Sequence, residues 1–84
     1  MPTASPQLSF TLSNDTRMIS VCRAFLEALC QTVDMDRRTI HAVVLATGEA
    51  VSNIIRHAHR DYPDAKIELR CRLLPDALEI ILLD

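Results

Sequence analysis

Three polar side chains that could take part in phosphoryl chemistry occur four residues apart: Glu49, Asn53 and His57. Four residues make slightly more than one turn of an α-helix, so on a helix these side chains form a nearly straight row. Mg²⁺ takes oxygen ligands and keeps several waters, and a nearby carboxylate can orient or deprotonate an attacking hydroxyl. The row fits such chemistry, although a Glu and an Asn are also common on a solvated helix face without any function.

Histidine and cysteine residues suggest two other kinds of site. His57 and His59 are two positions apart, which places their rings far apart around a helix, whereas helical zinc ligands are spaced by four. Cys22 and Cys30 share the apolar side of a predicted helix, where a thiol is usually inert packing. No two of the three cysteines form a C-x-x-C pair. We therefore expect no zinc site and no cysteine nucleophile, and we expect Cys22, Cys30 and Cys71 to be reduced core residues.

The apolar pattern predicts two helices, of which the second carries the polar row. The first is predicted over residues 15–33, after residues with N-cap chemistry at 14–16. The second begins after Asp34 or Asp36 and ends near His59. The apolar face predicted for the first helix consists of Met18, Val21, Cys22, Phe25, Leu29 and Val33. That predicted for the second consists of Ile40, Val43, Val44, Thr47, Val51, Ile54, Ile55 and Ala58.

Three strands flank these helices in the sequence. Apolar and polar residues alternate over 8–13 and again, completely, over 66–73, which is the period of a half-buried strand. Residues 61–64, Asp-Tyr-Pro-Asp, form a turn because proline ends helices. Residues 77–83 are a nearly continuous apolar run, which suits a central strand covered on both sides. The predicted fold class is α+β, a two-layer sandwich in the order β-α-α-β-β.

Composition and length indicate one globular domain. The 84 residues are 49% apolar and 24% charged, with a net charge of −2, so the chain is not disordered and lacks the basic surface of a nucleic-acid binder. No apolar stretch approaches the roughly 20 residues that span a bilayer, and no signal-peptide pattern occurs. We expect a single domain over residues 1–84 with a flexible leader at 1–6, located in the cytoplasm, without nucleic-acid or membrane partners.

The segment around the row, Glu-Ala-Val-Ser-Asn-Ile-Ile-Arg-His-Ala at residues 49–58, closely resembles the N box of the histidine-kinase-like ATPases. It is most similar to the anti-sigma-factor serine/threonine kinase branch of that superfamily. The resemblance covers nearly the whole chain, including the Asp-Tyr-Pro turn, the Pro-Asp hairpin and the strand that ends Ile-Ile-Leu-Leu-Asp. It implies the front half of the Bergerat fold, which is an incomplete ATP-binding domain.

The resemblance also implies roles for four residues. Glu49 would be the catalytic general base, Asn53 would hold Mg²⁺ against the phosphates of ATP, and His57 would support the cofactor site. Asp84 would accept a hydrogen bond from the adenine amino group. Strand parity is consistent with this role, because Asp84 shares a face with Leu82, and the alternative is a frayed chain end.

The chain departs from that family in its glycines. Backbone amides close on phosphates only where the chain accepts unusual dihedral angles, so a complete site needs glycine-rich loops. The only glycine, Gly48, lies inside the second predicted helix, where we expect it to permit close approach of a ligand or of neighbouring backbone. We therefore expect that this chain alone binds ATP poorly and is inactive, or that it forms a homodimer through the bare edge of the apolar strand 78–83.

By resemblance, the parent function is ATP-dependent phosphorylation of a serine on an anti-anti-sigma protein, together with sequestration of a sigma factor, and thus transcription regulation. Family members contact these partners through an arginine of the first helix. The matching position here is Ile19, and Arg17 and Arg23 are nearby but off register. The alternative is a nucleotide-free module that uses the same fold to bind partners or to dimerise. The two hypotheses differ in whether Glu49 and Asn53 are needed for function: the kinase requires them and the nucleotide-free module does not.

Overall fold

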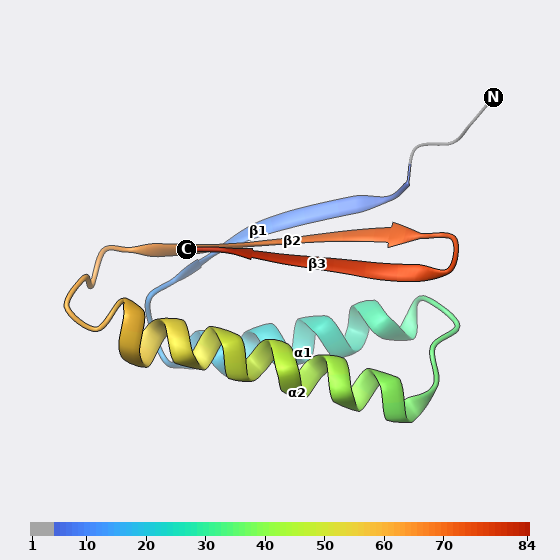
Figure 1. The fold of residues 1–84 in the computed structure, drawn as a ribbon, viewed down its shortest axis with the longest axis horizontal. Helices are drawn as coiled ribbons and strands as arrows, with labels where there is room; N and C mark the ends of the chain where they lie inside the picture. Colours follow the sequence, from blue (N-terminus) through green and yellow to red (C-terminus); the bar gives the residue numbers. More distant parts are fainter. Residues whose placement is uncertain (1–4) are drawn as a thin grey trace.

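In the computed structural model, which describes residues 5–84, two helices cover one face of a three-stranded antiparallel sheet (Figure 1). The elements in chain order are β1 (Gln7–Ser13), α1 (Arg17–Gln31), α2 (Arg37–Asn53), the π-helical turn η1 (Ile54–Ala58), β2 (Lys66–Leu74) and β3 (Ala77–Leu83). The predicted α+β class and the order β-α-α-β-β are confirmed. Residues 1–4 of the predicted leader lie outside the described range.

The sheet has the order β1-β2-β3, and its register places apolar residues opposite one another. Leu12 of β1 pairs with Ile67 of β2, and Leu69 of β2 pairs with Leu82 of β3. Directly opposite residues share a face, so these side chains all point toward the helices. The other face carries the polar members of the alternation, including two ion pairs, Glu68–Arg70 (2.8 Å) and Arg72–Glu79 (3.0 Å).

Residues 77–83 form a strand, and among the described residues it has the bare edge that we also expected and is not a central strand covered on both sides. Within residues 5–84, β3 pairs only with β2 and therefore lies at an edge. Its side chains toward the helices are half-buried, whereas Ile81 and Leu83 on the outer face are 40% and 39% exposed. A continuous apolar run indicates a strand, but it does not show which neighbours that strand has.

One core fills the space between the sheet and the two helices. Leu26 of α1, Val51 of α2, and Ile67 and Leu69 of β2 are completely buried in it. The predicted face of α1 was partly wrong, since Val21 is 49% exposed. The core side of α1 instead consists of Ile19, Cys22, Leu26, Leu29 and Cys30. The predicted apolar face included Val21, which points away from the sheet. The rotation of α1 about its axis is determined by its packing and could not be read from the sequence.

The helix ends follow local side-chain chemistry. Asp36, not Asp34, caps α2, because its Oδ1 accepts a hydrogen bond from the backbone N–H of Thr39 (2.7 Å). That bond lowers the pKa of Asp36. At α1 the capping residue Thr16 makes no side-chain bond. Asp15 instead accepts from the Arg17 N–H (2.8 Å), and its pairing with the Arg17 guanidinium lowers its pKa to about 2.

Asn14 joins the two loops at one end of the molecule. Its Nδ2 donates to the carbonyl oxygens of His59 (2.9 Å) and Tyr62 (3.0 Å), which are 45 and 48 residues away in sequence. The loop between β1 and α1 is thereby fixed to the loop that follows η1. Asn14 therefore acts in tertiary structure and not as the helix cap that its position suggested.

The three cysteines are free and buried, as predicted. Burial raises the pKa of the Cys22 and Cys30 thiols. Burial, together with the neighbouring Cys22 and Cys30, raises the pKa of Cys71 to about 11. All three therefore remain protonated at neutral pH, which makes them poor nucleophiles.

No helix within residues 5–84 combines the length and the hydropathy that a membrane span requires.

We predict that Asn14→Asp lowers the free energy of unfolding by about 1–3 kcal/mol. This change keeps the shape of the side chain but removes the donor that two loop carbonyls share. Urea denaturation followed by circular dichroism measures the loss, with Gln31→Glu at an exposed position of α1 as the amide-to-acid control. Equal stability of Asn14→Asp and Gln31→Glu would show that the two hydrogen bonds of Asn14 contribute nothing to stability.

We also predict that the protein loses stability between pH 9 and pH 11 and that Cys71→Val reduces this loss. The folded state raises the pKa of Cys71, so its contribution is complete below the pKa of the unfolded thiol and disappears as the pH rises through about 11. Urea unfolding at several pH values gives the slope of the unfolding free energy against pH for the wild type and for Cys71→Val. Identical slopes for the two proteins would contradict the buried-thiol explanation.

Candidate functional site

The polar row lies on one flank of the second helix. Glu49 and Asn53 are exposed members of α2 and are one turn apart. Thr47 and Val51 of the same helix are buried against the sheet, and Gly48 faces α1 through Arg23. With about 100° between successive residues, Glu49 and Asn53 point away from both the sheet and α1. Neither side chain forms a hydrogen bond with another residue in the range 5–84, so both are free for a ligand.

The π turn η1 determines where His57 lies. The His59 N–H donates to the carbonyl oxygen of Ile54, five residues earlier, over 2.7 Å. In an α-helix each step of four residues advances by about 40° around the axis. A π turn has more residues per turn and reverses that drift, so exposed His57 stays close to the line of Glu49 and Asn53. Single π turns in α-helices often occur at functional sites.

The same turn corrects one predicted contact. Ala58 was expected on the apolar stripe, but it is exposed, and His59 is buried at 7% exposure instead. The wider turn delays the rotation by about one residue, so position 59 takes the inward direction that an α-helix would give to position 58. The predicted end of the second helix near His59 is correct.

Gly48 is explained by a side chain, not by a ligand or by backbone as we expected. Arg23 of α1 lies across Gly48, and a Cβ at position 48 would overlap its Nε. The Nε itself is buried and makes no hydrogen bond within the described part of the chain. Gly48 therefore makes room for the Arg23 side chain between the helices. A lone glycine within a helix was the sequence signal for this contact, but its partner could not be read from the sequence.

Asp84 follows β3 and is exposed. Figure 1 shows that the end of β3 and the last turns of α2 lie at the same end of the molecule. By strand alternation Asp84 has the same direction as Leu82, toward the helix layer. The structure thus places all four predicted residues at accessible positions of the α2 and β3 side, with Glu49, Asn53 and His57 on one flank.

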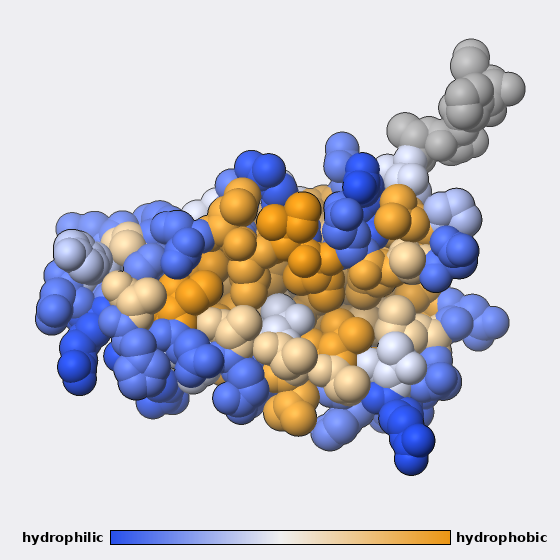
Figure 2. Space-filling model, viewed as in Figure 1, coloured by the Kyte–Doolittle hydropathy of each residue, from blue (hydrophilic) through white to orange (hydrophobic). Residues whose placement is uncertain are grey.

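An apolar surface borders this row. Figures 1 and 2 share one view, with β3 and α2 nearest the reader, and Figure 2 shows apolar side chains along most of the space between them. The half-buried apolar residues of the two elements and η1 are Val43, Val44, Ala50, Ile54, Leu78, Ile80 and Leu82. Apolar side chains beside a few polar groups are one feature of small-molecule sites.

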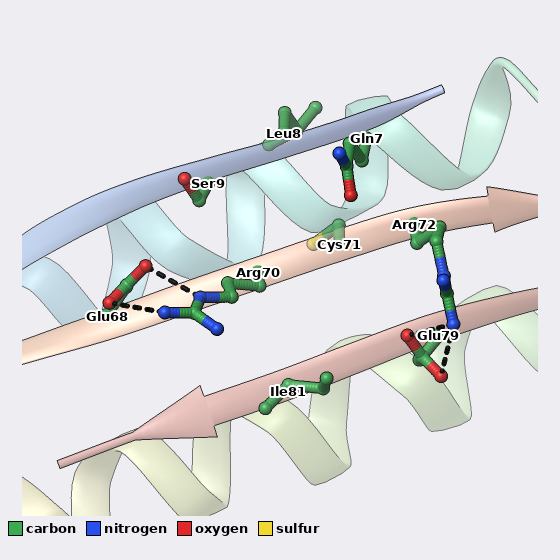
Figure 3. Close-up of a pocket in the computed structure, with 9 residues that line it drawn as sticks. All are labelled: Gln7, Leu8, Ser9, Glu68, Arg70, Cys71, Arg72, Glu79 and Ile81. Carbon is green, nitrogen blue, oxygen red and sulfur yellow. Dashed lines mark hydrogen bonds and ion pairs between the residues drawn. The ribbon is translucent and has the colours of Figure 1, made fainter. Parts of the chain in front are cut away.

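A separate hollow lies on the outer face of the sheet (Figure 3). Its four charged side chains form the two ion pairs described above, Glu68–Arg70 and Arg72–Glu79, which Figure 3 marks with dashed lines. These carboxylates and guanidiniums neutralise one another, so the hollow offers no free reactive group. Among residues 5–84 no three His, Cys, Asp or Glu side chains come together as a metal site.

Comparison with known protein families supports the fold described above. Residues 12–84 match the profile of a family described as the histidine kinase-like ATPase domain. No curated protein matches the chain.

We predict that Gly48→Ala is stabilising only when Arg23 is removed. In the Arg23→Ala background, Gly48→Ala should raise the free energy of unfolding by about 1 kcal/mol, because alanine has the higher helix propensity. In the wild-type background the new methyl group must displace the Arg23 side chain, so this increase should disappear or become a decrease. Thermal and urea unfolding of the four proteins of this double-mutant cycle measures the coupling, and equal effects in both backgrounds would rule out the contact.

Proposed function

We infer the function of this chain from its family: it belongs to the histidine kinase-like ATPase domain family, whose profile matches residues 12–84. ATP binding is the general property of such a domain. The observation that supports it in this chain is the exposed flank of α2, where Glu49 and Asn53 have no partners among the described residues and border an apolar surface.

We propose that this flank binds ATP with Mg²⁺ as the ATP-binding portion of a serine/threonine protein kinase of the anti-sigma type. The amide oxygen of Asn53 is a suitable ligand for Mg²⁺, which keeps several waters and needs few protein ligands. The carboxylate of Glu49, one turn earlier, is free to accept the proton of a substrate hydroxyl. The Asp84 carboxylate can accept a hydrogen bond from the adenine amino group, and His57 supports the same flank. Bound Mg²⁺ would offset the charge of the phosphates.

The described residues account for only part of the binding of ATP with Mg²⁺. A phosphate cradle made of backbone amides needs glycines at positive φ, and residues 5–84 contain none. The single glycine is helical and is covered by Arg23. In this proposal the described residues supply a metal ligand, a base and an adenine acceptor, and we expect weak binding of ATP because none of residues 5–84 forms a glycine phosphate loop.

The finer part of the proposal concerns partners. Phosphorylation of an anti-anti-sigma protein and sequestration of a sigma factor rest on the resemblance of residues 49–58. Ile19, which corresponds to the partner-contacting arginine of that branch, is buried at 8% exposure. Arg17 is exposed but paired with Asp15 (2.6 Å). If α1 docks such partners, it must use other contacts than that arginine.

The missing phosphate cradle favours one alternative, a nucleotide-free module that binds partners or a second copy. In that case Glu49 and Asn53 would be ordinary solvated residues, and their replacement would have no effect on function.

Calorimetric titration of the protein with ATP and Mg²⁺ separates these proposals. We expect weak, Mg²⁺-dependent binding that Asn53→Ala weakens at least about tenfold, as loss of a charge-assisted contact implies. Gln31→Ala, which removes an exposed amide from α1, is the matched control and should bind as the wild type does. Absence of binding, or equal binding by both variants, would contradict a nucleotide site on this flank and favour the partner-binding module.

A further inference from the structure

The π turn η1 buries a polar side chain where the sequence also offers an apolar one. His59 is 7% exposed, and its Nδ1 is buried without a hydrogen-bond partner among residues 5–84. Ala58, one position earlier, is exposed. An α-helical turn would direct Ala58 inward instead, because it contains fewer residues than a π turn. Burial of an unpaired polar atom is unfavourable, so the side chains of this segment by themselves favour the α-helical turn.

The backbone of η1 is compatible with either turn. In the π turn the Ile54 carbonyl oxygen accepts a hydrogen bond from the His59 N–H, over 2.7 Å. In an α-helical turn the same oxygen would accept from the Ala58 N–H. Both turns therefore satisfy this carbonyl, and the choice between them depends on contacts from outside the helix.

Asn14 supplies such a contact. Its Nδ2 donates to the carbonyl oxygens of His59 (2.9 Å) and Tyr62 (3.0 Å). The sheet determines where Asn14 lies, since the preceding residue, Ser13, pairs with Lys66 of β2. Figure 1 shows the loop after β1 and the loop after η1 at the same end of the molecule. Through Asn14 the sheet thus fixes the place of the backbone at residue 59.

The type of turn also sets the direction of His57. Along an α-helix the two steps of four residues from Glu49 to His57 would add up to about 80° around the axis. The π turn opposes this drift because it contains more residues per turn. His57 therefore stays in line with Glu49 and Asn53 only while η1 is a π turn.

We propose that Asn14 is a positioning residue of the candidate site: it holds η1 as a π turn and thereby directs His57 along the polar row. Without Asn14 the turn becomes α-helical, Ala58 moves inward and His57 rotates away from Asn53. The direction of His57 follows from these contacts alone, whereas its contribution to nucleotide binding rests on the proposed function.

The exposure of position 58 reports which turn is present. Ala58→Cys adds a thiol that is exposed in the π turn, and the native cysteines are buried and give only a slow background. We expect rapid labelling of this thiol by dithiobis(nitrobenzoate). Adding Asn14→Ala should slow the labelling at least about tenfold, because the thiol is then exposed only in a minor population. Gln31→Ala, which removes an exposed amide from α1, is the control and should not change the rate.

Leucine at position 59 tests the cause of this change. His59→Leu removes the buried Nδ1 and keeps an inward side chain of similar size, now apolar, so it should restore rapid labelling to the protein with Ala58→Cys and Asn14→Ala. If Asn14→Ala only loosened the loop, position 58 would stay exposed and labelling would be rapid with either residue at position 59. That result would overturn the proposal, and so would slow labelling that His59→Leu does not reverse.

Urea denaturation keeps the test decisive even if Asn14→Ala does not fold. His59→Leu alone should raise the urea midpoint, because it removes the unpaired buried nitrogen and retains the π turn. An unchanged or lower midpoint would show that the inward histidine has no cost, which contradicts the proposal.

Calorimetry with ATP and Mg²⁺ separates this inference from the proposed function. Asn14→Ala should weaken binding, and His59→Leu should restore it. A wild type that binds no nucleotide would contradict the proposed function, while the labelling of position 58 still decides whether Asn14 directs His57.

Discussion

Burial of the inner sheet face beneath α1 and α2 is the interaction on which the rest of this structure depends. Ile67 and Leu69 of the middle strand are completely covered by a helix layer that includes Leu26 and Val51, which are also completely buried. Among the described residues the two helices cover only this face of the sheet (Figure 1). The outer face stays exposed and carries two ion pairs together with Ile81 and Leu83 of β3.

This constraint makes α2 serve two purposes. One side of the helix must supply the core through residues such as Val51, while another flank presents the polar row. Both requirements continue into η1, where the π turn directs His59 inward and leaves His57 accessible. Asn14 then fixes the end of this segment by binding the His59 carbonyl. The position of the candidate site thus depends on the core and on a contact from the opposite end of the sequence.

The packing of α1 on α2 has a similar effect on the surroundings of Glu49. Arg23 occupies the space that a side chain at position 48 would need. The glycine therefore belongs to the helix interface and not to a phosphate loop. This distinction matters for function, because the described residues contain the polar row but no glycine at positive φ.

The space between β3 and α2 is the side of the molecule on which the nucleotide proposal depends. Figure 2 shows apolar side chains along most of it. Backbone amides that close on phosphates require glycines at unusual dihedral angles, and the described residues contain none at positive φ. The nucleotide proposal therefore rests on the polar row of α2 and η1 and on the apolar surface beside it.

The sequence by itself determined the elements, their order and the spacing of the polar row, because alternation and helical spacing are local properties that burial of one face imposes on the chain. It also determined that the three cysteines belong to the core. Only the tertiary structure decided that Val21 points outward and that His59, and not Ala58, points inward. The reason is that the rotation of a helix against its partner and a π turn depend on contacts between residues far apart in sequence. The same holds for Arg23 over Gly48 and for Asn14 at the η1 loop, whose partners are about 25 and 45 residues away.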